Sequence, residues 1–255
     1  MPLSDLRDPR DPCAQSYLRD VLHSFPREGP PRITIVKQAK AGIGGTGGTL
    51  GVFPASFNPP TAAHEALVRE ARNVVPLDEC LLVLDLQAMD KEVFGAPLED
   101  RLLMLLALFK ADPACSVGIC NRGLFLEKVE AVYQVYPQNT AIHFIVGYDT
   151  IERVLDCKYY GDRDQDLRSL FSQARFLVAN RAANDAQALK ALFAREENRP
   201  FAAQVVPLTL PPAVAWISSS AVRQQVAHGQ SVKGLVSPLL EEFLQKQGFY
   251  GRHDP

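Results

Sequence analysis

The chain has 255 residues, of which 47% are hydrophobic and 22% are charged, and its formal net charge at pH 7 is −2. A chain of this length and composition can bury about three quarters of its unfolded surface, which excludes disorder as its main state. The near-neutral charge excludes a general electrostatic attraction to nucleic acid or to anionic membranes, so any phosphate site must be local.

The five cysteines show neither a zinc-binding nor a redox spacing, and their odd number favours a reduced, intracellular compartment. Residues 1–30 lack an apolar core of the signal-peptide type, and the longest apolar run, residues 102–109, is too short to span a bilayer. We therefore expect a soluble protein of the cytoplasm, with the nucleus as a second compartment, that binds neither membrane nor nucleic acid. A homo-oligomer is compatible with these features.

Residues 1–48 are predicted to form an N-terminal extension in front of the main domain, residues 49–255. The extension contains a predicted short helix over Ser16–Phe25 and an alternating, β-branched strand over Arg32–Lys37. A glycine-rich segment, residues 42–48, satisfies the pattern GxGxxG, but the dinucleotide-binding fingerprint requires a helix directly after the glycines, and here a strand follows. We interpret this segment as a hairpin loop.

Strands and helices alternate through the rest of the chain. Apolar runs predict buried strands, and apolar residues at helical spacing predict the helices between them. Such alternation is typical of an α/β fold with a Rossmann-like parallel sheet and helices on both faces. The predicted strands are 50–53, 79–86, 114–120, 141–146, 176–179 and 203–210. One predicted helix begins at Thr61, and four others span 98–110, 122–136, 150–155 and 185–195.

The first candidate site is the segment SFNPPTAAH, residues 56–64, between a predicted strand and a predicted helix. A turn that leads into a helix leaves the first backbone N–H groups of that helix unpaired, and the helix dipole attracts anions to that end. Thr61 and His64 are three residues apart, so their side chains share one face of the helix. The segment therefore predicts a phosphate site. The alternative for His64 taken alone is a helix cap or a solvated side chain.

The second candidate site is the segment WISSSAVR, residues 216–223. Its three serines stand at a predicted helix start, where they cap the helix and leave N–H groups for phosphate oxygens. Arg223 follows Ser220 by three residues and projects from the same part of the helix, where its guanidinium suits a phosphate. A serine cap alone would be an ordinary structural feature, but its pairing with residues 56–64 indicates a phosphate site.

A third candidate is the segment Gly147-Tyr148-Asp149, which follows the predicted strand 141–146. In open α/β sheets, ligands bind at the carboxyl ends of the strands, and Asp149 is predicted to lie there. The alternative is that Asp149 caps the helix over residues 150–155. Both roles are compatible with the sequence.

The first candidate site resembles a known family. Residues 56–64 are similar to the (T/H)xGH signature of the nucleotidyltransferase superfamily. Within it they most resemble nicotinamide or nicotinate mononucleotide adenylyltransferases, whose motif begins GGSFNPP. Here Pro54-Ala55 stands where that family has two glycines, Thr61 takes the first histidine position, and Ala63 replaces the glycine.

Three other segments resemble the same family. Residues 217–223 are similar to its ISSTxIR element, and residues 147–149 to its Gly-x-Asp element. Residues 91–104, KEVFGAPLEDRLLM, resemble a loop that carries a lysine, followed by a helix with Arg-x-x-Met. The resemblance implies that Lys91 contacts a phosphate, with a solvated loop lysine as the alternative, and that Asp149 contacts the ribose or the metal.

The resemblance implies adenylyl transfer from ATP to nicotinamide or nicotinate mononucleotide. Mg²⁺ would be held mainly through the ATP phosphates, since the sequence has no dense carboxylate cluster and no residue is assigned to a metal site of the protein's own, and a protonated His64 would stabilise charge at the α-phosphate. The implied catalytic residues are His64 and Arg223; the implied ATP-binding residues are Ser56, Phe57, Thr61, His64, Ser218, Ser219, Ser220 and Arg223; and the implied mononucleotide-binding residues are Lys91, Gly147, Asp149 and Tyr159.

Two departures from the family keep other functions open. Where the family carries a tryptophan that stacks on the nicotinamide ring, this chain reads CKYYGD, in which Tyr159 or Tyr160 offers an aromatic face or packs in the core. This favours, as an alternative, a related nucleotidyltransferase with another phosphorylated acceptor. Pro54-Ala55 motivates a different class, an ATP-binding regulatory protein with weak or no transfer activity.

Overall fold

The computed structural model describes residues 12–86, 95–180 and 185–250. In this part of the chain seven strands form one sheet, in the order β1-β4-β3-β2-β5-β6-β7. The strands are β1 (Ile33–Lys37), β2 (Thr49–Ala55), β3 (Glu79–Asp85), β4 (Cys115–Cys120), β5 (Ala141–Gly147), β6 (Ala174–Asn180) and β7 (Val205–Thr209). The helices are α1 (Pro12–Ser24), α2 (Ala62–Val74), α3 (Leu98–Leu108), α4 (Phe125–Tyr133), α5 (Tyr148–Val154), α6 (Arg163–Gln173), α7 (Asp185–Ala194), α8 (Pro212–Ala215), α9 (Ser219–Ala227) and α10 (Pro238–Gln247), with short 3-10 helices η2 (Cys157–Tyr159) and η3 (Arg199–Gln204).

Strands β2 to β7 run parallel, in the order of a doubly wound α/β fold. The chain builds outward from β2 through β3 to β4, and then returns to add β5, β6 and β7 on the other side of β2. The strand order therefore reverses between β2 and β5, and ligands bind at the carboxyl ends of such a strand pair. The predicted α/β fold with a Rossmann-like parallel sheet is confirmed.

The predicted hairpin over residues 42–48 is wrong, because β1 does not pair with β2. Strand β1 lies antiparallel to β4 at the edge of the sheet, so the chain passes β4 and β3 before it enters β2. Glu79 holds the connection between β1 and β2 in place. It is fully buried, and its carboxylate accepts a hydrogen bond from the backbone N–H of Ile43 at 3.0 Å. A Cβ at Gly42 would overlap this carboxylate, which explains the glycine at that position.

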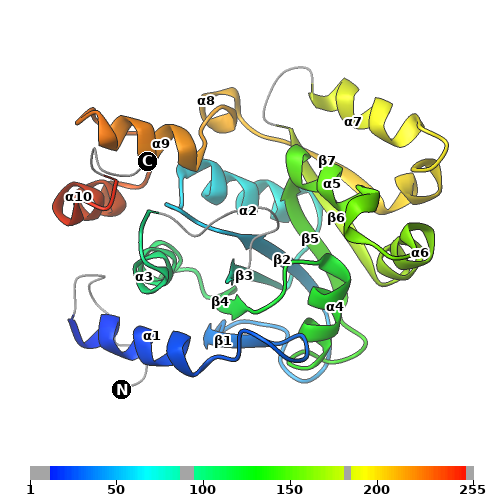
Figure 1. The fold of residues 1–255 in the computed structure, drawn as a ribbon, viewed down its shortest axis with the longest axis horizontal. Coiled ribbons are helices and arrows are strands. Elements are labelled where there is room, and N and C mark those ends of the chain that lie inside the picture. The colour runs from blue at the N-terminus through cyan, green and yellow to red at the C-terminus, as the bar shows by residue number, and fades with distance from the viewer. Residues whose placement is uncertain (1–11, 87–94, 181–184, 251–255) are drawn as a thin grey trace.

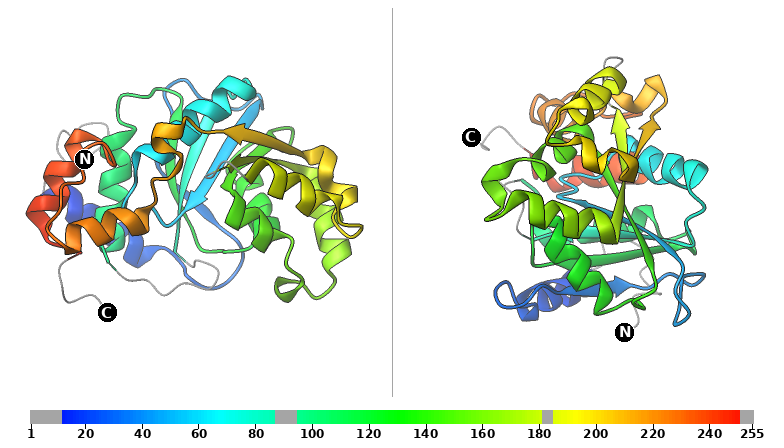
Figure 2. Two further views of the ribbon diagram at one scale, coloured as in Figure 1. Left: turned by 90° about the horizontal axis from the view of Figure 1, so that it is seen from above. Right: turned by 90° about the vertical axis from the view of Figure 1, so that its right-hand side faces the viewer.

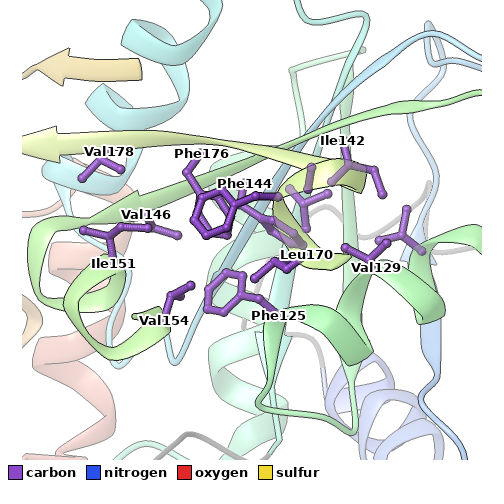
Figure 3. Packing of buried hydrophobic residues seen from close by; sticks show 14 of the residues in the cluster. Phe125, Val129, Ile142, Phe144, Val146, Ile151, Val154, Leu170, Phe176 and Val178 are labelled. Carbon is purple, nitrogen blue, oxygen red and sulfur yellow. The ribbon is translucent and has the colours of Figure 1, made fainter. Parts of the chain in front are cut away.

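Helices cover both faces of the sheet, as predicted (Figure 1). Helices α1, α2 and α3 bury apolar side chains on one face, and α4 to α7 bury theirs on the other. Figure 3 shows the second face, where the rings of Phe125 in α4 and Phe144 in β5 meet edge to face at 4.9 Å between centroids. Helix α6 was not predicted, because it is mostly polar and its buried residues, Leu167, Leu170 and Phe171, form only a narrow stripe.

A third apolar cluster joins the C-terminal helices to α2 and α3. It contains Ala63 of α2, Met104 of α3, Val222 of α9 and Phe243 of α10. Figures 1 and 2 show α9 and α10 together at one end of the molecule, opposite α6 and α7. Because Ala63 and Val222 directly precede His64 and Arg223 in the sequence, this cluster fixes the two motif helices relative to each other.

The N-terminal helix and strand predicted for residues 1–48 are α1 and β1. Helix α1 packs against α3, where Gln15 Nε2 donates to Asp100 Oδ1 at 3.0 Å. The division of the chain at residue 48 stays a prediction. None of the helices in the three described ranges is both long and apolar enough to cross a membrane.

Candidate active site

The first and third candidate segments flank the point where the strand order reverses. Residues 56–61 leave the carboxyl end of β2, and Gly147 ends β5. The β2–β5 ladder stops at the pair Val52 and Phe144, although both strands continue. Pro54, which has no N–H to donate, lies just past this pair and is aligned with β3 on its other side. The segments therefore lie where open α/β sheets bind ligands.

His64 is buried in the first turn of α2, and Thr61 fixes its imidazole. The backbone N–H of Thr61 donates to Nδ1 of His64 at 2.9 Å, and the Thr61 hydroxyl lies 2.8 Å from the same nitrogen. Because a backbone N–H can only donate, Nδ1 is the acceptor, and the neutral ring carries its proton on Nε2. This contact favours the neutral ring over the protonated form expected from the sequence, and the neutral ring still donates from Nε2.

The start of α2 is less open to anions than predicted. The N–H of Ala62 donates to the carbonyl of Leu235 at 2.9 Å, and the N–H of His64 donates to the carbonyl of Thr61 at 2.9 Å. The prediction that the first N–H groups of this helix are unpaired is therefore wrong for these two. Thr61 and His64 do share one face of the helix, but there they bond to each other.

The second motif docks directly onto the first. The hydroxyl of Ser219 donates to the carbonyl of Pro59 at 2.8 Å, and Nη1 of Arg223 donates to the carbonyl of Asn58 at 2.7 Å. These pairs are 160 and 165 residues apart in the sequence. The structure thus brings together the two segments that sequence analysis selected separately.

The other two serines of the motif have different partners. Ser218 is the N-cap of α9, as predicted, and its hydroxyl accepts the N–H of Ala221 at 3.1 Å. The hydroxyl of Ser220 accepts Nη2 of Arg223 at 3.0 Å, which confirms that these two side chains share a face. Contact of the serines with ATP phosphates stays a prediction.

Phe57 has a strained backbone at the turn between β2 and α2. Its φ is 43°, a left-handed conformation that bulky residues rarely adopt, and such strain clusters at functional sites. Its ring is only 1% exposed and packs against Phe53 and His64, with centroids 5.4 and 5.2 Å apart. The predicted contact of Phe57 with ATP would therefore come from its backbone.

Buried side chains behind the loop hold Ser56 and Asn58. Arg101, which is 3% exposed, donates from Nη1 to the carbonyl of Ser56 at 3.4 Å and from Nε to the carbonyl of Ala96 at 2.7 Å. Burial lowers the pKa of Arg101 below its usual value. Asn58 Oδ1 accepts the Tyr250 hydroxyl at 2.7 Å and the Ala96 N–H at 3.3 Å. Sequence analysis missed Asn58 and Tyr250 as site residues, because no local pattern links positions 192 residues apart.

On the β5 side, the structure places three of the predicted mononucleotide-binding residues. Gly147 is the N-cap of α5, and Asp149 lies exposed in its first turn, so the alternative that Asp149 caps this helix is wrong. Nζ of Lys158 lies 4.7 Å from the centroid of the Tyr159 ring. Tyr160 instead donates its hydroxyl to the carbonyl of Val154 at 2.6 Å and packs against the core.

Lys91, the fourth of these residues, lies outside the described residues.

A buried ion pair that sequence analysis missed lies at the carboxyl end of β3. Nζ of Lys128 lies 3.2 Å from Oδ1 of Asp85, the last residue of this strand. Burial raises the pKa of Asp85 to about 6, against the opposing effect of Lys128. Lys128 is 1% exposed because it lies on the buried face of α4 with Phe125 and Val129, although lysine is usually a surface residue.

Comparison with known proteins identifies related sequences. The chain is 33% identical over 134 residues to "Putative nicotinamide mononucleotide adenylyltransferase" of Schizosaccharomyces pombe, a match that covers 51% of this chain and only 52%, about half, of that relative. It is 26% identical over 206 residues to "Probable nicotinate-nucleotide adenylyltransferase" of Gemmatimonas aurantiaca, covering 79% of this chain and 92% of the relative. A protein with the same name from Syntrophotalea carbinolica is 27% identical over 219 residues, covering 79% and 96%.

The family match covers both motifs. Residues 52–225, more than half of the chain, match the family described as Cytidylyltransferase-like. This range contains His64, Arg223, the carboxyl-terminal half of β2 and all of β5. The chain therefore belongs to the cytidylyltransferase-like family of nucleotidyltransferases.

Proposed function

We propose that this nucleotidyltransferase transfers AMP from ATP to nicotinamide or nicotinate mononucleotide, giving NAD or its deamido form and pyrophosphate. The observation that carries the proposal is the direct bonding of the two motifs, from Arg223 to the Asn58 carbonyl and from Ser219 to the Pro59 carbonyl, at the carboxyl edge of the sheet. The names of the relatives, which include both nicotinamide and nicotinate enzymes, support this acceptor class.

In the proposed reaction, an oxygen of the mononucleotide phosphate attacks the α-phosphorus of ATP. A new P–O bond forms there, and the bond from the α-phosphorus to the bridging oxygen of the β-phosphate breaks, so that pyrophosphate leaves. Such chemistry asks for positioning and charge stabilisation rather than for a covalent enzyme intermediate.

The residues at the carboxyl edge would divide this work. His64, oriented through Nδ1 by Thr61, would donate from Nε2 to a non-bridging oxygen of the α-phosphate as negative charge develops. The start of α9 and the guanidinium of Arg223 would hold the β- and γ-phosphates. On the β5 side, Asp149 and Tyr159 would contact the mononucleotide, with Lys91 as the further predicted phosphate contact.

Mg²⁺ would arrive with ATP. In the described part of the chain, no group of three or more His, Cys, Asp or Glu residues is placed to hold an ion. Mg²⁺ commonly binds through substrate phosphates and one or two carboxylates and keeps several waters. The carboxylate of Asp149, exposed in the first turn of α5, is the oxygen ligand that the β5 side would offer it. When bound, the ion would neutralise charge on the phosphates.

A related enzyme with another phosphorylated acceptor is the second candidate. It is favoured by the tyrosines at positions 159 and 160, where the family carries tryptophan, since only Tyr159 is left to face a ligand once Tyr160 packs in the core. The regulatory alternative rests on Pro54-Ala55. Both residues pair in register with β3, so this departure from the family leaves the end of strand β2 intact.

The test is a direct assay of purified protein with ATP, Mg²⁺ and either nicotinamide or nicotinate mononucleotide, followed by chromatography. We expect dinucleotide and pyrophosphate in equal amounts with one of the two acceptors, and neither product when the acceptor is omitted. ATP that protects the protein against thermal unfolding without forming product with either acceptor would contradict the proposal, and would favour another acceptor or the regulatory alternative.

A further inference from the structure

The loop of residues 56–59, termed here the nucleotide loop, is held through its carbonyl oxygens by side chains from outside it. Within the described residues, three of its four carbonyls accept such hydrogen bonds, each from a different residue. The donors are Arg101 to Ser56, Arg223 to Asn58 and Ser219 to Pro59, at 3.4, 2.7 and 2.8 Å. The position of this loop therefore depends on residues of α3 and α9, far from it in the sequence.

The side chain of Asn58 provides a fourth attachment, which involves Tyr250. Asn58 is 5% exposed and Tyr250 is 1% exposed, so neither polar group can replace a lost partner with bulk water. The Tyr250 hydroxyl donates to Asn58 Oδ1 at 2.7 Å, a shorter contact than the 3.3 Å bond from the Ala96 N–H to the same oxygen. A buried amide oxygen that loses its nearer donor is costly, so this contact should hold the Asn58 side chain in one orientation.

The ring of Tyr250 is confined as tightly as its hydroxyl. A Cβ at Gly95 would lie 2.8 Å from Cε1 of Tyr250 and 2.9 Å from Oδ1 of Asn58, and Gly95 also has a φ of 83°, which suits glycine. Burial raises the pKa of Tyr250 above its usual value. The phenol therefore stays protonated near neutral pH and keeps its proton for Asn58.

We propose that Tyr250 is a positioning residue of the nucleotide site, which acts through the side chain of Asn58 to hold the nucleotide loop in the conformation that binds the triphosphate. The proposal rests on the proposed function only in taking a nucleoside triphosphate as the ligand of this site. Its binding consequence needs no more than a nucleoside triphosphate at the carboxyl edge of the sheet.

The matched pair of variants is Tyr250→Phe and Tyr136→Phe. Both tyrosines are buried, and each donates its hydroxyl to a buried side-chain oxygen, that of Asn58 for Tyr250 and that of Glu79 for Tyr136, at 2.7 and 2.5 Å. Glu79 begins β3 and so lies at the amino end of the parallel strands, whereas Asn58 follows the carboxyl end of β2. If both hydroxyls serve stability alone, the two variants should therefore change triphosphate binding alike. If Tyr250 positions the nucleotide loop, only Tyr250→Phe should weaken triphosphate binding.

Isothermal titration of the full-length protein with ATP and with CTP, each with Mg²⁺, measures the dissociation constant of every variant. We expect Tyr250→Phe to raise the dissociation constant of the triphosphate that the wild type binds by about tenfold, and Tyr136→Phe to change it less than twofold. In the Asn58→Ala background, Tyr250→Phe should add less than a twofold change, because its partner is gone. Equal effects of the two phenylalanine variants, or a full Tyr250→Phe effect without Asn58, would overturn the proposal.

If Tyr250→Phe does not fold, Gly95→Ala serves as the second variant, because its Cβ would press on both groups of the hydrogen bond; an unchanged dissociation constant there would also overturn the proposal. Failure of the proposed function has a different signature. A wild type that forms no dinucleotide but binds a triphosphate more tightly than Tyr250→Phe would refute the pyridine-nucleotide reaction and support the role of Tyr250. A wild type that binds neither triphosphate would overturn both.

Discussion

Buried hydrogen-bond networks lie at both ends of the parallel strands, and they differ in what they join. At the amino end, the carboxylate of Glu79 accepts bonds from Ser116, Tyr136 and Ile43 at 2.5, 2.5 and 3.0 Å. It ties β3 to β4, to the segment that follows α4 and to the glycine-rich connection. At the carboxyl end, the network is centred on Asn58 and Ser56 and ties the nucleotide loop to α3, α9 and the C-terminal segment.

The difference shows how similar bonds can serve stability at one end and geometry at the other. The amino-end network contains no residue of the family motifs, and its central group is a side chain. In the carboxyl-end network most accepting groups are backbone carbonyls of one loop, so each donor helps to set the course of that loop. Substitutions should therefore reduce stability without activity loss at the amino end, and activity at the carboxyl end.

The largest effect is expected from His64→Ala, which should lower kcat about 10²- to 10³-fold through loss of the donor at the α-phosphate. His64→Asn is the matched variant, because its amide oxygen can still accept the Thr61 N–H near the position of Nδ1 but places nothing at the position of Nε2. We expect His64→Asn to melt closer to the wild type than His64→Ala does, while its initial rate of dinucleotide formation stays low. Full activity in His64→Asn would reduce His64 to a helix cap.

Replacement of Arg223 should have the next largest effect. Its guanidinium reaches the Asn58 carbonyl through Nη1 and the Ser220 hydroxyl through Nη2, a two-point contact that a lysine cannot reproduce. We expect kcat/KM to fall by about 100-fold in Arg223→Ala and by about tenfold in Arg223→Lys. Wild-type kinetics in Arg223→Lys would show that a positive charge alone suffices.

Glu79→Gln should affect stability alone. A glutamine places an amide N–H₂ where one carboxylate oxygen accepted, so at least one buried donor among Ser116, Tyr136 and Ile43 loses its partner. We expect the free energy of unfolding to fall by about 2 kcal/mol in denaturant titrations. At denaturant concentrations below the unfolding transition, kcat/KM of Glu79→Gln should stay within twofold of that of the wild type. A large fall in kcat/KM would break the distinction between the two ends of the sheet.

The smallest effect concerns Asp100, which belongs to neither network and accepts Gln15 at the contact of α1 with α3. Burial, with the nearby charge of Glu99, raises the pKa of Asp100 from 3.8 to about 6. Between these values the folded state binds more protons than the unfolded state, so this carboxyl lowers stability as the pH rises through that window. We expect the Tm of Asp100→Asn minus that of the wild type to increase by about 3 °C from pH 5 to pH 8. A constant difference would contradict the raised pKa.

Much of the fold followed from the sequence, because strands buried on both faces leave apolar runs that local patterns reveal. The position of β1 did not, since its pairing with β4 involves residues far along the chain. In the candidate site, local motifs selected His64 and Arg223 for prediction, but they did not reveal the bonds that join the two segments. For example, the N–H of Ala62 donates to the carbonyl of Leu235, and no sequence pattern around residue 62 predicts this bond. Long-range hydrogen bonds are thus what the sequence could not supply.

The central claim is that the triphosphate binds where the two motifs meet. A crystal structure with α,β-methylene-ATP and Mg²⁺, an analogue that cannot release pyrophosphate, tests this most directly. We expect the α-phosphate within hydrogen-bond distance of His64 Nε2, and the β- and γ-phosphates at the start of α9 beside Arg223. An ordered analogue bound elsewhere, with His64 and Arg223 making no contact to it, would contradict the account.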